Sequence, residues 1–371
     1  MSVERITLVS VKLENVPKTF YGKKVLDGVS LKIDDQSFTS ILGPPGAGKT
    51  TLLRIIAGVE APDEGKIYFD EKDVTELPAR DRKVAMVYQS FALYPHMRVY
   101  DNIASPMKVM KLPADEIDKK VKSVAEFLGI HRLLDRYPRE LSGGEAQRVA
   151  IARSLTKEAT VYLLDEPLTN LDYKLRESMR GELRRIFKER GGTIIYATPD
   201  PLDTLVMAQY VAVIRDGKIE QYGSVQEVYD KPKNSYTGRY FSFPPMNFID
   251  SELVIRKKKY YLQAPGLNLE VTHLKNLLSE RSYSLGLRPN KIHILTEEME
   301  NLISIPLEVI ITEIIGSETL VHLKYSDSRL VAHSPTIVRY EPGEKIKIGF
   351  NPNDLYIFGK ETGELITQSS R

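Results

Sequence analysis

A phosphate-binding loop is indicated by the run Gly43-Pro44-Pro45-Gly46-Ala47-Gly48-Lys49-Thr50. It fits the pattern G-x-x-x-x-G-K-[ST] and lies between an apolar segment, 37–42, and a helical segment that begins near Lys49. Glycines let backbone N–H groups curl around phosphate oxygens, and the following helix adds its positive dipole end. Lys49 would reach the β- and γ-phosphates, and the Thr50 hydroxyl would bind Mg²⁺. The alternative is a plain glycine turn before a helix.

A second candidate site is an apolar run, 161–164, that ends in the carboxylates Asp165 and Glu166. A buried strand of this kind delivers its acids to the mouth of an α/β sheet. Asp165 would hold Mg²⁺ directly or through water, and Glu166 would polarise an attacking water. A strand ending in Asp-Glu is by itself often only a solvated edge. Together with a phosphate loop, it indicates a hydrolytic site.

A second glycine-bearing turn, Leu141-Ser142-Gly143-Gly144-Glu145, precedes the acidic strand. A serine hydroxyl, glycine N–H groups and a following helix N-terminus form an anion site. The same groups also make an ordinary helix N-cap, so both interpretations use the same amides. Two phosphate-contacting surfaces in one chain cannot easily serve one nucleotide. The sequence therefore predicts a dimer that closes around ATP.

The composition is that of an ordinary globular protein. The chain has 371 residues, enough for two domains, with 42% hydrophobic and 27% charged residues. A net charge of +2 gives no reason to expect a nucleic-acid partner, and the absence of cysteine excludes disulfides and thiolate metal sites. No apolar run reaches the roughly 18 residues of a membrane span, and residues 1–16 resemble a strand rather than a signal peptide.

The hydrophobic pattern divides the chain into two domains, 1–242 and 243–371, joined near 242–247. The first alternates strands with helices, which predicts an α/β fold with a largely parallel sheet. Its predicted strands are 37–42, 84–88, 161–165 and 193–197, and its predicted helices are 49–58, 114–129, 144–157 and 174–189. The second domain has short alternating runs separated by turn residues, which predicts an all-β barrel.

These motifs resemble those of the ATP-binding-cassette (ABC) ATPases, in order and in spacing. The turn at 141–145 matches the family signature, Gln89 matches the glutamine loop, and Asn170-Leu171-Asp172 matches the D-loop. Tyr21 lies where the family stacks an aromatic ring on adenine, a contact worth roughly 1–3 kcal/mol per base.

The resemblance extends to the C-terminus. Segments 238–250, 284–294 and 343–366 resemble the hinge and the OB-like β-barrel regulatory domain of carbohydrate importers of the maltose and glycerol-3-phosphate type. The resemblance therefore implies a P-loop nucleotide-binding cassette followed by that regulatory domain.

The resemblance implies ATP and Mg²⁺ as cofactors and assigns the site residues by role. ATP would be bound by Tyr21, Gly43, Pro44, Pro45, Gly46, Ala47, Gly48, Lys49, Thr50 and Thr51. Catalysis would fall to Glu166 and Gln89, Mg²⁺ to Thr50, Gln89 and Asp165, and partner-bound ATP to Ser142, Gly143, Gly144 and Glu145, with Asp172 in the D-loop.

The resemblance also implies partners and a place in the cell. A second ABC ATPase subunit and two transmembrane permease subunits would assemble at the cytoplasmic face of the membrane, with an extracytoplasmic substrate-binding protein acting indirectly. Phe91, Leu93, Tyr94 and Met97 would be exposed to receive a coupling helix of the permease. A small satellite core is the alternative for these four residues. The cargo would be a sugar, oligosaccharide or polyol, with polyamine, iron and sulfate importers as alternatives.

Two positions depart from the family pattern. Pro199 stands where the family has a histidine that contacts the γ-phosphate, and proline offers no side-chain donor and no N–H. Asp200 and Pro201 still form a good helix start. Glu145 stands where glutamine is usual, and its carboxylate is unfavourable near a triphosphate unless it points away or pairs with a cation.

These departures leave several functions open. The chain could be the weakened half of a heterodimer, or one copy of a homodimer in which Glu166 carries most of the rate. It could also be a mainly regulatory subunit with little turnover, or a non-transport cassette protein. The last kind usually carries tandem cassettes or long insertions, whereas this chain has one cassette and a β-domain.

Overall fold

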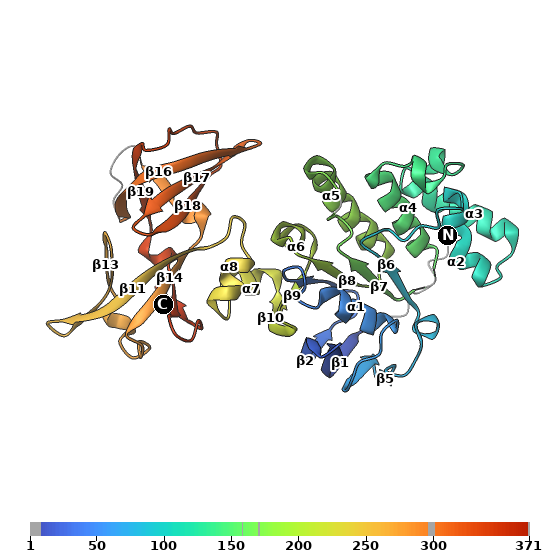
Figure 1. Cartoon of the computed structure of the whole chain (residues 1–371), viewed down its shortest axis with the longest axis horizontal. Coiled ribbons are helices and arrows are strands. Elements are labelled where there is room, and N and C mark those ends of the chain that lie inside the picture. Colours follow the sequence, from blue (N-terminus) through green and yellow to red (C-terminus); the bar gives the residue numbers. More distant parts are fainter. Residues whose placement is uncertain (1–8, 158, 170, 296–300, 370–371) are drawn as a thin grey trace. The chain divides into compact units, whose positions relative to one another are not determined.

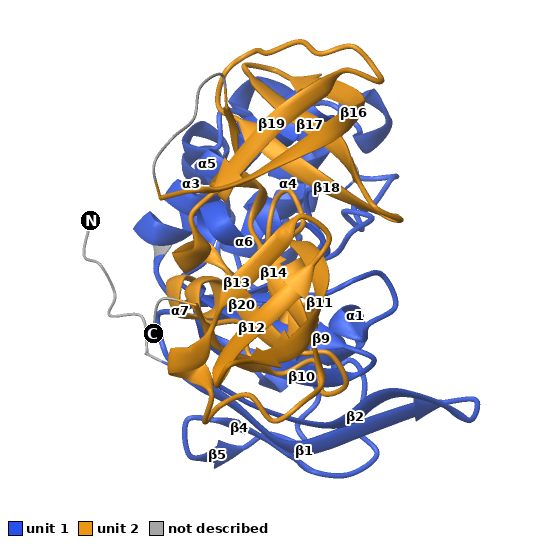
Figure 2. Ribbon diagram, turned by 90° about the vertical axis from the view of Figure 1, so that its left-hand side faces the viewer, with its two compact units in different colours: residues 1–225 blue, residues 226–371 orange. Residues whose placement is uncertain are grey.

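The computed structural model describes residues 9–157, 159–169, 171–295 and 301–369. The chain packs as two compact units, 1–225 and 226–371, which Figure 2 shows in different colours. The predicted fold class is confirmed, since an α/β unit precedes a unit built mainly of antiparallel strands.

The first unit is organised around a sheet of order β10-β9-β3-β8-β7-β6. Its neighbours from β9 to β6 run parallel, and β10 is antiparallel at the edge. The strands of this sheet are β3 Phe38–Leu42, β6 Val84–Val87, β7 Val161–Asp165, β8 Thr193–Thr198, β9 Tyr210–Arg215 and β10 Lys218–Ser224.

Both faces of this sheet are covered, which explains the continuous apolar runs of its central strands. Along β7, Tyr162 and Leu164 pack into one core, and Val161 and Leu163 pack into another. The helices of the unit are α1 Lys49–Ala57, α2 Val99–Val109, α3 Ala114–Phe127, α4 Gly143–Leu155, α5 Tyr173–Arg190 and α6 Pro201–Met207 (Figure 1). Short 3-10 helices span Ala79–Asp81, His131–Leu133 and Pro138–Glu140.

A second, antiparallel sheet of order β2-β1-β4-β5 adds to the predicted parallel one. Its strands are β1 Val11–Phe20, β2 Lys23–Ile33, β4 Lys66–Phe69 and β5 Lys72–Asp73. Leu52 and Ile56 of α1 pack with Leu13 of this sheet and Ile41 of the parallel one, so α1 shares a core with both sheets. The predicted N-terminal strand is present from Val11, while Glu4 lies outside the described residues.

The second unit holds α7, α8 and two antiparallel sheets, of order β13-β12-β11-β14-β20-β21 and β15-β19-β16-β17-β18. Its helices are α7 Val225–Asp230 and α8 Ser235–Tyr240, with short 3-10 helices at Thr272–Leu274, Pro289–Lys291 and Pro352–Asp354. Its strands are β11 Asn247–Arg256, β12 Lys259–Ala264, β13 Leu267–Glu270, β14 Ser282–Leu287, β15 His293–Leu295, β16 Ile303–Ile315, β17 Glu318–Tyr325, β18 Ser328–Ser334, β19 Lys345–Phe350, β20 Tyr356–Gly359 and β21 Leu365–Gln368.

The compact units divide at 225–226, earlier in the chain than the predicted boundary at 242–243. The reason lies in the packing of α7 and α8 on the β-sheet. The buried Arg288 guanidinium lies 3.4 Å from the centre of the Tyr229 ring and donates to the carbonyls of Tyr229 and Phe241. Gly238 of α8 packs closely against Met246. Packing therefore places α7 and α8 in the second compact unit. Whether the domains themselves divide at 242–243 stays a prediction.

Candidate active site

The predicted phosphate loop connects β3 to α1 and has the backbone that such a loop needs. A Cβ atom on Gly43 would lie 2.4 Å from the Ile214 carbonyl oxygen, so only glycine fits there. Gly48, the N-cap of α1, has φ of 102°, a conformation that side chains strongly disfavour. Pro45 and Gly46 at the tip are exposed. The loop therefore presents backbone N–H groups at a helix N-terminus, where an anion binds favourably.

Lys49 is 3% exposed and fully engaged. Its ammonium donates to the carbonyls of Gly43, at 2.8 Å, and Pro44, at 3.0 Å, and lies 2.9 Å from Glu166 Oε1. A buried ammonium needs such partners, because desolvation without them would be very costly. The structure thus brings the predicted phosphate-binding cation and the predicted catalytic base together.

Thr50 and Asp165 also meet, as the sequence predicted. The Thr50 hydroxyl donates to Asp165 Oδ1 at 2.9 Å, and Asp165, at the end of β7, is 3% exposed. Burial raises the pKa of the Asp165 carboxyl above its ordinary value, while the Thr50 hydrogen bond opposes this and Glu166 adds to it. An inward carboxylate beside a hydroxyl is a hard-oxygen donor set, and it fits Mg²⁺, which takes few protein ligands beside substrate phosphates.

Glu166 is held in an unusual backbone conformation, with φ of 45°. Its N–H donates to the Ala197 carbonyl at 3.0 Å, and its Oε2 accepts from the Thr169 hydroxyl at 3.3 Å. Positive φ in a residue with a side chain costs on the order of 1–3 kcal/mol and persists only when neighbours enforce it. The β7–β8 pairing and these bonds therefore fix where the Glu166 carboxylate points.

The other predicted site residues lie on separate elements of the first unit. Tyr21 is fully exposed at the turn between β1 and β2, and Gln89 is exposed just beyond β6. Asp172 caps α5 by accepting from the Leu175 N–H at 3.0 Å, and Asn170 lies outside the described residues. Their contacts with a nucleotide remain predictions.

The signature turn forms a complete capping box at the start of α4. Ser142 Oγ accepts from the Glu145 N–H at 3.4 Å, and Glu145 Oε2 accepts from the Ser142 N–H at 2.9 Å and from its hydroxyl at 3.0 Å. The Ser142 N–H lowers the pKa of the Glu145 carboxyl. Glu145 thus folds back onto the turn, and Ser142 and Gly143 remain exposed for another ligand.

The turn that carries Pro199 is stabilised by a charged network that the sequence did not predict. Asp200 caps α6, as expected, and its Oδ2 lies 2.7 Å from Arg180 Nη2. Arg180 also pairs with the buried Asp203 at 2.7 Å, and Asp203 accepts from the Tyr196 and Thr198 hydroxyls. Asp200 and Asp203 are three residues apart and so share one helical face, which is a sequence signal for a charged cluster. The arginine that pairs with both belongs to α5, so the sequence around the two acids does not reveal it.

The segment after Gln89 is only partly exposed, which corrects the prediction. Tyr94 is 45% exposed, whereas Phe91, Leu93 and Met97 are half-buried. Phe91 and Leu93 pack against the large core beneath them, so they do not form the small satellite core that was the alternative.

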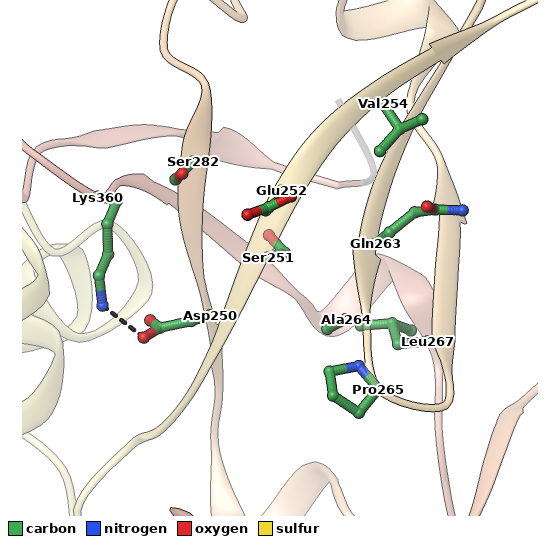
Figure 3. A pocket seen from close by; sticks show the side chains of 10 residues that line it. All are labelled: Asp250, Ser251, Glu252, Val254, Gln263, Ala264, Pro265, Leu267, Ser282 and Lys360. Carbon is green, nitrogen blue, oxygen red and sulfur yellow. Dashed lines mark hydrogen bonds and ion pairs between the residues drawn. The ribbon is translucent and has the colours of Figure 1, made fainter. Parts of the chain in front are cut away.

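A separate hollow of about 660 Å³ lies in the second unit, and it shares no residue with the phosphate loop. Figure 3 shows its lining, which comes from β11, β12, β13, the turn between β12 and β13, β14 and Lys360. The Lys360 ammonium pairs with Asp250 at 2.6 Å. The chemistry described above therefore lies outside this hollow.

Comparison with known proteins gives two family matches and full-length relatives. Residues 26–169 match the ABC transporter family, and residues 285–358 match the TOBE domain. The trehalose/maltose import ATP-binding protein of Thermococcus litoralis is 39% identical over 97% of this chain and 100% of its own length. The oligosaccharides import ATP-binding protein of Bacillus subtilis is 36% identical over 96% of this chain and 99% of its own.

A solved structure extends the comparison to a dimer. A dimeric ATP-binding cassette in a post-hydrolysis state, bound to ADP and Pi, matches with a TM-score of 0.53 and 31% identity, over 58% of this chain and 98% of that one. The matched motifs, the full-length relatives and the geometry of the phosphate loop agree. The chain therefore belongs to the ATP-binding subunits of ABC importers, and a TOBE domain follows its cassette.

Proposed function

We propose that this chain hydrolyses ATP to energise the import of a sugar, an oligosaccharide or a polyol. One observation carries the proposal: at the phosphate loop, Lys49 pairs with Glu166 at 2.9 Å and the Thr50 hydroxyl donates to Asp165 at 2.9 Å. The sugar class is supported by the relatives of Thermococcus litoralis and Bacillus subtilis, whose names specify trehalose/maltose and oligosaccharides.

The side chains at the loop have distinct roles in hydrolysis. The loop amides and Lys49 hold the β- and γ-phosphates, and Tyr21 stacks on the adenine. Thr50, Asp165 and Gln89 would hold Mg²⁺, which when bound neutralises charge on the β- and γ-phosphates. Glu166 orients the attacking water and accepts its proton, a role worth typically 10²–10⁴-fold in rate.

Two subunits close around ATP in this proposal. Ser142, Gly143 and Gly144 contact the γ-phosphate held by a partner's loop, and Asp172 lies at the same interface. The exposure of Ser142 and Gly143 and the dimeric form of the related cassette support this arrangement.

The subunit would dock on two permease subunits at the cytoplasmic face of the membrane, and the exposed Tyr94 is available for that contact. Closure of the cassettes would move the permeases, and hydrolysis would release the closed pair. An extracytoplasmic substrate-binding protein would act indirectly, through the permeases. In the described part of the chain, no helix has the length and apolarity needed to span a bilayer.

A second candidate, a mainly regulatory subunit with slow turnover, is favoured by one observation. Pro199 replaces the γ-phosphate-contacting histidine that the resemblance predicts, and the turn around it is held by Arg180, Asp200 and Asp203.

Steady-state phosphate release from the purified chain tests both candidates. We expect slow turnover that rises in Pro199→His and vanishes in Glu166→Gln. Fast turnover that Pro199→His does not increase contradicts the weakened site.

Uptake measurements test the substrate class. Cells that lack this chain, complemented with wild type or with Lys49→Ala, are compared for uptake of labelled sugars, polyols, polyamines, sulfate and iron. We expect only wild type to restore uptake of a sugar or polyol. Restored uptake of one of the other three substrates instead assigns the chain to that importer class.

A further inference from the structure

Gln147 of the signature helix α4 has an unexplained polar side chain. It is 0% exposed, and within the part of the chain that the structure describes, neither its amide nitrogen nor its amide oxygen has a hydrogen-bond partner. A buried amide without partners is unfavourable, whereas an apolar side chain of similar shape would be tolerated or would stabilise the fold. Because its unpaired amide destabilises the single subunit, we look for a role of Gln147 in another conformation, where the amide could be hydrogen-bonded.

The position of Gln147 on α4 shows which elements its helical face packs against. It follows Gly143 by four residues and Gly144 by three, so the three residues share one helical face. On that face, a Cβ on Gly143 would lie 3.4 Å from the Leu171 side chain, and one on Gly144 only 2.7 Å from Leu175. The neighbouring Arg148 pairs with Glu182 of α5 at 2.9 Å. This face of α4 therefore packs against the D-loop and α5.

The direction of the side chain adds a second indication. Side chains on an α-helix lean toward its N-terminus, so helix geometry directs Gln147 toward the signature glycines, beside which Leu171 of the D-loop lies. The Leu171 carbonyl has a weak bond in this structure, 3.4 Å from Arg176 Nη2, while the same nitrogen donates to the Thr169 carbonyl at 3.1 Å. A carbonyl with spare acceptor capacity thus lies on the element that Gln147 faces.

We propose that Gln147 is a positioning residue that ties the signature turn to the D-loop when two subunits close around ATP, its side-chain amide donating to the Leu171 carbonyl. This inference rests on the closure described under the proposed function. Each subunit would gain a bond between the turn that contacts a partner's ATP and the loop that lies at the same interface. Gln147 would then favour the closed dimer without touching nucleotide.

The test replaces Gln147 with methionine, an unbranched side chain of similar length without the amide. Dimerisation is measured by sedimentation, with and without Mg²⁺-ATP, in the background of Glu166→Gln, which blocks hydrolysis. Melting temperatures are measured without nucleotide. The matched control is Thr237→Val in α8 of the second unit, which also removes a buried hydroxyl that lacks a partner among the described residues.

We expect Gln147→Met to change stability and assembly in opposite directions. Its melting temperature should rise by roughly 2–4 °C, because an unpaired buried amide is removed. Its ATP-dependent dimerisation should weaken by roughly tenfold, since each closed subunit loses a hydrogen bond. In the hydrolysing background, kcat should fall while KM for ATP stays nearly unchanged. Thr237→Val should leave dimerisation unchanged.

Three results overturn the proposal in distinguishable ways. A lower melting temperature for Gln147→Met means that the amide already supports the fold in the single subunit. Unchanged dimerisation and kcat mean that the amide has no part in closure. A Glu166→Gln parent that stays monomeric with ATP overturns the closure of two copies of this chain, and the role of Gln147 with it.

Discussion

The Lys49 ammonium lies 2.9 Å from the Glu166 carboxylate, and both side chains are largely buried. The cation expected to hold phosphate is therefore paired with the base expected to activate water. A triphosphate that binds the Lys49 ammonium has to displace the Glu166 carboxylate from it. Once displaced, the carboxylate is free to accept a proton. Substrate binding and activation of the base are thus linked through one ion pair.

Glu166→Gln tests this link, because it removes the charge and keeps the shape. We expect ATP hydrolysis to fall by about 10²–10⁴-fold, as for loss of a general base. The affinity for ATP should stay the same or rise, because ATP binding no longer has to break an ion pair between Lys49 and a carboxylate. Phosphate release and titration with a fluorescent ATP analogue measure the two effects. Glu182→Gln, which removes an ion-paired carboxylate from α5, is the control and should change neither.

Asp165 should make the stability of the subunit depend on pH. Its pKa is raised in the fold, chiefly by burial, so the folded chain holds this proton more tightly than the unfolded chain. The corresponding stabilisation is present below the unfolded pKa, ordinarily 3.8, and is lost as pH rises through the higher folded value.

Asp165→Asn should remove this dependence. Relative to wild type, the variant's free energy of unfolding in urea without Mg²⁺ should increase as pH rises above 3.8. It should also lose the rise in melting temperature that Mg²⁺-ATP gives wild type. A variant that becomes relatively less stable with rising pH would show that the carboxylate, rather than the carboxylic acid, is favoured in the fold.

Glu145 should weaken the engagement of a partner's ATP through its charge. Its carboxylate accepts a hydrogen bond from the Ser142 hydroxyl at 3.0 Å, and a γ-phosphate would need the same hydroxyl as donor. Glutamine could still accept the Ser142 N–H, so Glu145→Gln should change stability by no more than about 0.5 kcal/mol. In the Glu166→Gln background, its ATP-dependent dimer should be tighter, because repulsion between carboxylate and phosphate is removed.

A nearby carboxylate provides the control for this variant. Glu140 accepts the Tyr137 N–H at 2.6 Å in a similar cap of a short helix. Glu140→Gln should leave the dimerisation constant within twofold, roughly 0.4 kcal/mol. Equal effects of the two variants would indicate that only net charge matters, and weaker dimerisation of Glu145→Gln would contradict the proposed repulsion.

The local sequence pattern was sufficient to predict much of this site. Contacts between residues far apart in the sequence could not be predicted from it. The loop at 43–50 and the strand ending in Asp165 carry their own signals, and the structure places them together. The Arg180 and Asp203 pair joins two helices, so neither residue's surroundings reveal it. The positive φ of Glu166 arises from its bond to Ala197 on β8. Partial burial of Phe91 and Leu93 likewise depends on the core beneath them.

Arg153, near the end of α4, connects the signature helix to the segment after Gln89. Its guanidinium donates to the carbonyls of Ala92, at 2.8 Å, and Phe91, at 3.1 Å, and lies 5.3 Å from the centre of the Tyr94 ring. Phe91 and Ala92 both have positive φ, 61° and 49°. Such a pair is strained by on the order of 1–3 kcal/mol per residue, so the two hydrogen bonds hold the segment in place.

Arg153→Met should release this segment and leave the phosphate loop intact. We expect faster hydrogen exchange at residues 90–94, since the strained turn loses both of its side-chain donors. Arg153→Lys should give an intermediate rate, because an ammonium lacks the planar fork that reaches two carbonyls. Phosphate release by the isolated chain should be nearly unchanged, whereas ATP-driven uptake by the assembled importer should fall. Because α4 begins at the signature turn and ends at Leu155, just beyond Arg153, we expect movement at one end of the helix to reach the other. Unchanged exchange at 90–94 in Arg153→Met would show that Arg153 does not hold this segment.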